Sequence, residues 1–155
     1  WHGAELAAMP GNMTTSPTRP LTASELLAHP DVIQAMDEAW VDSQTDDPDN
    51  RHEEGGWIYM DLTTAVIAIR RAPTGARSRL SLASPPLLPN HLIVGTFHTH
   101  PNPASEGWTT EPSTQDELAA RHTGVPWLIR AEDGDHSTGP DSRRGGIGGV
   151  AGFPP

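Results

Sequence analysis

Two histidines at the end of a predicted strand are the residues most able to do chemistry in this chain. His98 and His100 follow an apolar, β-branched run, His91–Phe97, which predicts a buried strand. Side chains at positions i and i+2 leave the same face of a strand, so the two imidazoles project together. Pro101 lacks the N–H that a sheet ladder needs and predicts the end of the strand. Paired neutral imidazoles of this kind can bind a first-row metal ion.

Asp116 is the candidate third ligand. It lies in the first turn of a helix predicted over Ser113–Arg121, where free N–H groups and the helix dipole favour a carboxylate. Two imidazoles and one carboxylate leave a fourth tetrahedral position for water, which is the arrangement of catalytic rather than structural zinc. The sequence therefore predicts one Zn²⁺ per chain, bound by His98, His100 and Asp116.

A water-activating metal enzyme also needs a general base within hydrogen-bond reach of the water. Two neighbouring acids, Glu53 and Glu54, precede a strand predicted over Trp57–Met60. On an extended chain their carboxylates face opposite sides, so only one of them can face the metal. The local pattern by itself leaves the choice open, because a bulge near Gly55 and Gly56 would exchange the two sides.

Taken together, these residues resemble the JAMM motif of the JAB/MPN family of zinc metallopeptidases. That motif runs Glu, then His-Ser/Thr-His-Pro, then Ser-x-x-Asp, and the matching residues here are Glu53, His98–Pro101 and Ser113–Asp116. In the family the Glu stands three residues before a Gly that two hydrophobic residues follow. This frame fits Glu53 before Gly56 and places Glu54 one position out.

The resemblance, which covers about Glu53 to Arg130, implies a role for each matched residue. Glu53 would take a proton from the water and pass it to the leaving amine, and the Ser113 hydroxyl would stabilise the developing oxyanion. The implied activity is that of a deubiquitinase-like hydrolase, a metalloprotease that cuts an isopeptide or peptide bond. The implied partner is a protein substrate, namely the C-terminal Gly of a ubiquitin-like protein or its conjugate.

One departure from the family pattern lies in the segment between Pro101 and Ser113. Residues 102–112 make it longer than the family's usual spacing, and such an insertion costs little free energy in a loop. The longer segment is therefore expected to change the rim of the substrate-binding site more than the metal site. Trp108 in this segment is a candidate substrate-binding residue, with pinning of the loop as its alternative role.

The expected fold is a single α/β (α+β) domain over residues 21–135, with a curved, mixed, mostly antiparallel sheet flanked by helices, as the resemblance to the JAB/MPN fold also implies. Thr22–Glu25 is a capping-box pattern, and Pro30 suits the first position of a second helix. That second helix carries an apolar stripe for packing on a sheet. The stripe consists of Val32, Ile33, Met36, Ala39 and Trp40. Further strands are predicted over Thr63–Ile69, Leu80–Ala83 and Val125–Arg130.

Residues 1–20 are expected to be a leader, and residues 136–155 a Gly/Pro-rich C-terminal tail. Arg143–Gly146 is similar to the basic-Gly-Gly end of ubiquitin-like modifiers. The segment could be one that is offered to an active site of this kind, or a Gly-rich tail could contain the same residues by chance, and the sequence leaves both interpretations open.

The composition excludes several functional classes. The chain has 155 residues and a formal net charge of −10, without a basic cluster, which argues against binding to nucleic acid or to an anionic membrane surface. It contains no Cys, so thiol catalysis and Cys-based zinc sites are excluded. No apolar run approaches the ~20 residues of a membrane-spanning helix, and a cytoplasmic protein is expected.

Two other functional classes compete with a metallopeptidase. The first is a non-catalytic MPN-type binding scaffold, but such proteins typically lose ligands that are all present here. The second is a cupin-like metal enzyme, suggested by Gly95, His98, His100 and Glu106. The Gly and Glu spacings do not fit the cupin pattern, and a Ser-x-x-Asp helix is unexpected there.

Overall fold

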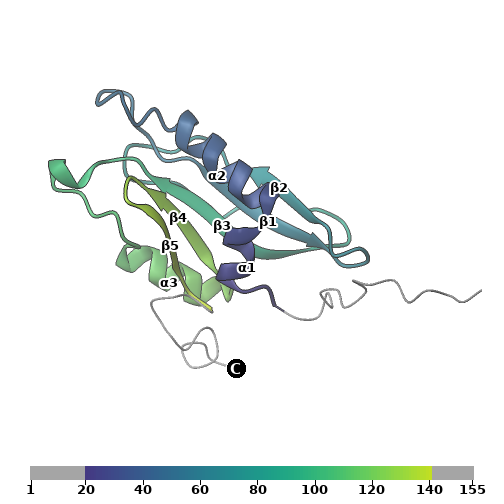
Figure 1. Cartoon of the computed structure of the whole chain (residues 1–155). Helices are drawn as coiled ribbons and strands as arrows, with labels where there is room; N and C mark the ends of the chain where they lie inside the picture. The colour runs from purple at the N-terminus through teal and green to yellow at the C-terminus, as the bar shows by residue number, and fades with distance from the viewer. Residues whose placement is uncertain (1–19, 141–155) are drawn as a thin grey trace, which may run out of the picture.

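The computed structural model describes residues 20–140 and shows them as a single α+β domain built on a five-stranded sheet (Figure 1). The strand order is β2-β1-β3-β4-β5, and every neighbouring pair is antiparallel except β3 and β4, which run parallel. The predicted class, α+β with a mixed and mostly antiparallel sheet, is confirmed. The strands are β1 (Gly55–Asp61), β2 (Ile67–Arg71), β3 (His91–His100), β4 (Trp127–Ala131) and β5 (Gly134–Thr138).

Two helices, α1 (Ala23–Ala28) and α2 (Pro30–Asp42), pack on one face of the sheet. The predicted capping box is present, because the Glu25 N–H donates to Thr22 Oγ1 over 3.0 Å and the Thr22 N–H donates to Glu25 Oε1 over 3.2 Å. Pro30 occupies the first turn of α2, as predicted, where its missing N–H costs nothing.

The buried stripe of α2 differs from the prediction at three positions, because Ala35 joins it, Ile33 is exposed and Trp40 is only partly buried. Val32, Met36 and Ala39 are buried, and Ala35 joins them. Ile33 instead remains 40% exposed, because it lies at the margin of a stripe centred on positions 32, 35, 36 and 39. These side chains pack with Ile58, Met60, Phe97 and Leu128 of the sheet and form the main core.

The opposite face of β1 is covered by an irregular segment rather than by a strand. The Trp57 indole N–H donates to the Leu82 carbonyl over 3.1 Å, and the Tyr59 hydroxyl donates to the Pro86 carbonyl over 2.6 Å. The strand predicted over Leu80–Ala83 is therefore wrong: side-chain bonds and apolar packing hold this segment, not a ladder.

β2 also begins later than predicted. The backbone N–H groups of Thr63 and Thr64 donate to Asp61 Oδ1 over 2.7 and 2.8 Å, which closes a tight turn after β1. The prediction of a strand over Thr63–Ile69 is thus wrong in its first half, and β2 starts at Ile67.

The two glycines that open β1 allow close approach of three strands. A side chain at Gly55 would collide with the Phe97 carbonyl of β3, and one at Gly56 with the Arg70 carbonyl of β2. The sequence pattern allowed either close approach or a bulge here, and the structure shows close approach.

The bulge lies instead in β3. Ile58 pairs with Gly95 and Tyr59 pairs with Ile93, so Val94 is an extra residue in the ladder. Val94 and Phe97 can therefore both contact the core beneath α1 and α2. Since Phe97 points to the helix-covered face, the next residue, His98, points to the other face.

Helix α3 (Thr114–Thr123) connects the two parallel strands, β3 and β4, as a crossover. Parallel strands need such a crossover because a tight turn cannot join them. The chain leaves β3 at its carboxyl end, so α3 begins near the two histidines, apart from α1 and α2 (Figure 1). The helix predicted over Ser113–Arg121 is confirmed, with Ser113 as its N-cap and an end two residues later, at Thr123.

The sheet continues to Thr138, beyond the domain boundary expected at residue 135, because β5 pairs with β4. The expected leader, apart from residue 20, and the Arg143–Gly146 segment lie outside the described residues. Within residues 20–140, no helix has both the length and the apolarity needed to cross a membrane.

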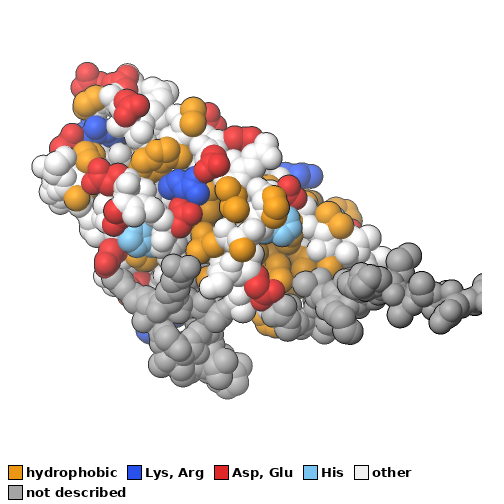
Figure 2. Space-filling model, viewed as in Figure 1, with side chains coloured by type: hydrophobic (Ala, Val, Ile, Leu, Met, Phe, Trp, Pro, Cys, Tyr) orange, Lys and Arg blue, Asp and Glu red, His pale blue; other side chains and the backbone are white. Residues whose placement is uncertain are grey.

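The surface is strongly acidic near one end of the molecule. Figure 2 shows acidic side chains gathered where α2 leads into its connecting loop. Exposed Asp46 and Asp49 belong to that loop. This acidic loop contributes to the formal charge of −10.

Candidate metal centre

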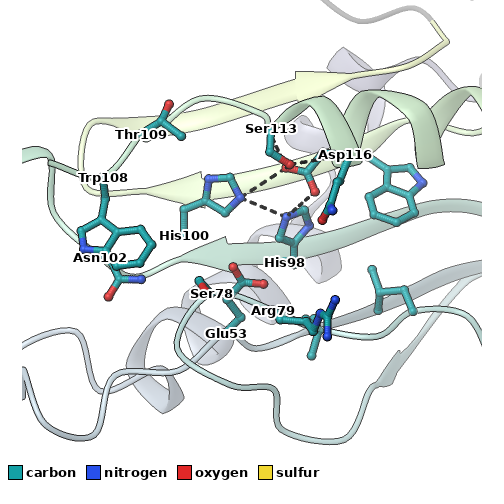
Figure 3. A pocket seen from close by; sticks show the side chains of 14 residues that line it. Glu53, Ser78, Arg79, His98, His100, Asn102, Trp108, Thr109, Ser113 and Asp116 are labelled. Carbon is teal, nitrogen blue, oxygen red and sulfur yellow. Dashed lines mark hydrogen bonds and ion pairs between the residues drawn. The ribbon is translucent and has the colours of Figure 1, made fainter.

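His98, His100 and Asp116 converge at the carboxyl end of β3, as Figure 3 shows. His98 Nε2 lies 3.2 Å from His100 Nε2 and 3.2 Å from Asp116 Oδ1, and His100 Nε2 lies 3.4 Å from Asp116 Oδ2. His98 is 4% exposed and Asp116 is 9% exposed. The three predicted ligands therefore form one nearly buried group that could hold a metal ion.

The three side chains are close enough to contact one ion. Their ligand atoms all lie within 4.8 Å of one another, and the closest separations are 3.2, 3.2 and 3.4 Å. Two imidazole nitrogens and one carboxylate form a donor set that suits Zn²⁺.

Asp116 owes its position to the start of α3. Ser113 is the N-cap: its Oγ accepts from the Asp116 N–H over 3.1 Å, and its own N–H and hydroxyl each donate to Asp116 Oδ2 over 2.8 Å. Burial alone would raise the pKa of Asp116, but hydrogen bonds from His100 and His98 outweigh it and hold that pKa well below its usual range. Asp116 is therefore an ionised carboxylate, the form that binds metal.

The far nitrogens of both imidazoles are unusual. Nδ1 of His98 and Nδ1 of His100 are buried without a hydrogen-bond partner in the described chain. The His98 ring instead packs edge-on against Trp127, with ring centroids 5.9 Å apart. The rings are thus oriented by packing and by Asp116 rather than by an acceptor behind each one.

Glu53 and Glu54 have different environments in the folded chain. Glu54 receives hydrogen bonds from Arg71 Nη2 and Thr74 Oγ1, both 2.9 Å long, and lies 3.0 Å from His52 Nε2. Glu53 lines the cavity that contains the metal group, and its carboxylate has no hydrogen bond or ion pair within residues 20–140. The structure therefore turns Glu53, not Glu54, toward the candidate metal centre (Figure 3).

The electrostatic setting of Glu53 favours its protonated form when no cation is bound. Burial, and secondarily the negative charge of Asp116, raise the pKa of Glu53 to about 8. A carboxyl group with a pKa near neutrality can accept and release a proton at physiological pH, which is what a general base requires.

The cavity in front of the metal group has a volume of about 220 Å³. Its walls include the predicted site residues Glu53, His98, His100, Ser113 and Asp116, and also Trp108, the predicted substrate contact. Trp108 is 38% exposed and follows the short 3-10 helix Ala104–Glu106 in the long loop. All predicted site residues thus line one cavity.

The sequence did not single out the hydrogen bonds behind the two histidines. Thr99, between them, points toward the helix-covered face, where its Oγ1 lies 2.6 Å from Ser43 Oγ and accepts from the Glu54 N–H over 3.0 Å. The Thr99 N–H donates to the Glu54 carbonyl over 2.9 Å. These bonds connect the end of α2, the end of β3 and the segment that carries Glu53.

Two further cavity residues, Arg79 and Asn102, were also not predicted as site residues. Asn102 could have been suspected because it directly follows His100-Pro101. Nothing in the sequence around Arg79 indicates proximity to the metal group.

Comparisons with protein-family models, curated proteins and solved structures find no match to this chain.

Proposed function

We propose that this chain is a zinc-dependent metallopeptidase that hydrolyses an isopeptide or peptide bond. The observation that carries the proposal is the joint placement of two features in one cavity. The ligand atoms of His98, His100 and Asp116 lie within 4.8 Å of one another, and in the same cavity the Glu53 carboxylate is buried without a partner in the described residues.

The roles of the residues follow from their contacts. A zinc ion held by His98, His100 and Asp116 would supply Lewis acidity, which acidifies water and polarises the scissile carbonyl. Glu53 accepts a proton from the attacking water and delivers it to the leaving nitrogen as the C–N bond breaks. The products are a carboxylic acid and an amine, so one water is consumed for each bond cut.

Ser113 lies on the opposite side of the group from Glu53 (Figure 3). Its hydroxyl donates to Asp116 Oδ2 in the folded chain, so its first role is to orient this ligand. Rotation of the hydroxyl hydrogen about the Cβ–Oγ bond would redirect it to the substrate oxygen. We propose that Ser113 makes this hydrogen bond as negative charge develops on that oxygen.

The substrate class that we propose is the C-terminal Gly of a ubiquitin-like protein, joined to an amine. The likeness to the JAMM motif suggests it. The candidate site lies in a cavity of about 220 Å³ whose walls include Trp108 and Trp127.

Metal content, measured by mass spectrometry on the purified protein, tests the first half of the proposal. The wild type should hold about one zinc per chain, and His100→Ala and Asp116→Ala should lose it, because two ligands bind a divalent cation far more weakly than three. His122→Ala is the matched control, since His122 is exposed near the end of α3 and away from the site. A wild type that takes up no zinc on reconstitution would leave a non-catalytic scaffold as the better interpretation.

Hydrolysis tests the second half. A suitable substrate is a ubiquitin-like protein whose terminal Gly carries aminomethylcoumarin as the leaving amine. Glu53→Gln should keep its zinc and lose activity by about 10²–10⁴-fold, the usual contribution of a general base. Zinc-loaded wild type that cleaves no Gly-terminated conjugate would refute the proposed substrate.

A further inference from the structure

Arg79 has no acidic partner although it lines the candidate active-site cavity. Arg51, Arg71 and Arg130 each pair with a carboxylate, at N–O distances of 2.9, 2.9 and 2.7 Å for the pairs with Glu106, Glu54 and Asp135. Arg79 has no side-chain hydrogen bond or ion pair within residues 20–140. Arg79 is exposed to solvent and lines the cavity, so its guanidinium is available to pair with an acid supplied by a bound molecule.

The backbone of Arg79 is fixed relative to Glu53. The Gly75 N–H donates to the Glu53 carbonyl over 2.9 Å, and the Glu53 N–H donates to the Ala76 carbonyl over 2.8 Å. The Ala76 N–H then donates to the Arg79 carbonyl, also over 2.8 Å. Glu53 and Arg79 therefore belong to one hydrogen-bonded wall of the cavity, even though 25 residues lie between them in the sequence.

The same turn is held from a second side. Asn102, which follows the end of β3, donates from Nδ2 to the Arg77 carbonyl over 2.8 Å. In Figure 3, Asn102 and Trp108 lie toward one end of the cavity and Arg79 toward the other, with Glu53 between them. Arg79 thus stands beyond the general base, on the opposite side from Trp108.

We propose that Arg79 binds a carboxylate on the leaving-amine part of the substrate, an inference that rests on the proposed function. Glu53 must reach the leaving nitrogen to deliver its proton, so the amine product lies against the wall that carries Glu53. Arg79 is part of that wall. Its guanidinium offers paired N–H donors whose planar geometry matches a carboxylate.

The carboxylate could come from either of two positions in the substrate. One is the α-carboxylate of a C-terminal residue directly after the scissile bond, and the other is an Asp or Glu side chain at that position. Both place a negative charge a few atoms from the leaving nitrogen. Hydrolysis releases the carboxylate with the amine product, and Arg79 takes no part in bond breaking, so it determines specificity and is not a catalytic residue.

Peptide binding to zinc-loaded Glu53→Gln protein, measured by calorimetry, tests this without turnover. The first probe pair is acetyl-Gly-Gly-Ala with a free carboxylate and its C-terminal amide. The second pair is acetyl-Gly-Gly-Asp amide and acetyl-Gly-Gly-Asn amide. We expect one charged probe to bind about 5–10-fold more tightly than its neutral partner, as a charge-assisted pair at a partly exposed site provides.

The Arg79→Gln substitution in the same background should reduce this preference to less than about twofold, since the charge and the paired donors are both lost. Arg77→Gln is the matched control, because Arg77 lies in the same turn but its side chain donates to the Pro48 carbonyl, outside the cavity. It should retain the full preference.

Two results would overturn the role of Arg79. The first is that neither charged probe binds better than its neutral partner. The second is that the preference survives Arg79→Gln, because the carboxylate would then bind elsewhere. Zinc content, measured on the same samples, separates this failure from failure of the proposed function. A protein without zinc fails the proposed function, and a zinc-loaded protein without the preference fails only the role of Arg79.

Discussion

Two adjacent glutamates in this chain have contrasting environments in the folded protein. Glu54 is neutralised by Arg71 and hydrogen-bonded by Thr74, so it stabilises the packing between β1 and β2. Glu53 has no such partner and faces the cavity. A buried carboxyl without a partner costs stability when it ionises, which is common at catalytic sites and unusual elsewhere.

The pKa of Glu53 predicts how stability depends on pH in the metal-free protein. Burial raises that pKa from 4.5 to about 8, so the folded chain binds more protons than the unfolded chain between these values. Stability should therefore fall as pH rises from 4.5 to 8, by a few kcal/mol, because each pKa unit is worth about 1.4 kcal/mol.

Glu53→Gln should abolish this contribution. Thermal or urea unfolding of the metal-free proteins should give nearly equal stabilities near pH 4.5, and a more stable Gln variant near pH 8. The difference between the two proteins isolates Glu53 from the other titrating groups. A difference that is independent of pH would contradict the raised pKa.

At the scale of secondary structure, the end of β3 is held from both faces. His98 and His100 face the cavity, while Thr99 contacts Ser43 and the backbone of Glu54 behind them. The two histidines and the backbone beside Glu53 are thereby joined to the end of α2. β3 ends before Pro101, and the chain continues through the long loop to α3.

Thr99→Val should show how much this contact contributes. Valine keeps the shape but leaves the Glu54 N–H unpaired and removes one of the two partners of Ser43 Oγ, which also donates to the Ala39 carbonyl. This should destabilise the fold by about 1–3 kcal/mol. Zinc affinity, measured by competition with a chelator, should fall as well, because both histidines flank position 99. Thr114→Val, at an exposed position in α3, is the control and should change neither quantity. Unchanged zinc affinity in a destabilised Thr99→Val protein would show that the ligands do not depend on this contact.

At the scale of the whole molecule, the ligands connect the sheet to α3. His98 and His100 belong to β3, and Asp116 belongs to the helix that crosses over to β4. A metal ion bound between these elements stabilises the folded chain by mass action.

Removal of zinc should therefore lower the melting temperature of the wild type. Free zinc at 100 times its dissociation constant stabilises by about 2.7 kcal/mol, which corresponds to a shift of about 5–15 °C for a domain of this size. Scanning calorimetry with zinc and with a chelator measures the shift, and Asp116→Ala should not show it. Equal melting temperatures for the wild type under both conditions would argue against a metal between these elements.

Much of the candidate site could be predicted from sequence because its signals are local. The i, i+2 spacing of His98 and His100 determines that they share a face of any strand, and Ser113-x-x-Asp116 determines a capped helix start. Asp133-Gly134, a dipeptide typical of tight hairpins, also marks the β4–β5 turn. The strand that follows, Gly134–Thr138, is polar, and the tail expected from residue 136 therefore included its second half.

The likeness to the family motif already favoured Glu53, but only the tertiary structure supplied the physical reason that Glu53 faces the cavity, and it alone showed which arginine lines that cavity. The side chosen by Glu53 depends on pairing of Glu54 with Arg71 and Thr99, far away in sequence. The bulge at Val94 depends on pairing with β1, and the position of Arg79 depends on backbone bonds to Glu53. Spacing along the chain specifies side-chain direction within one strand or helix, whereas contacts between elements depend on how the core packs.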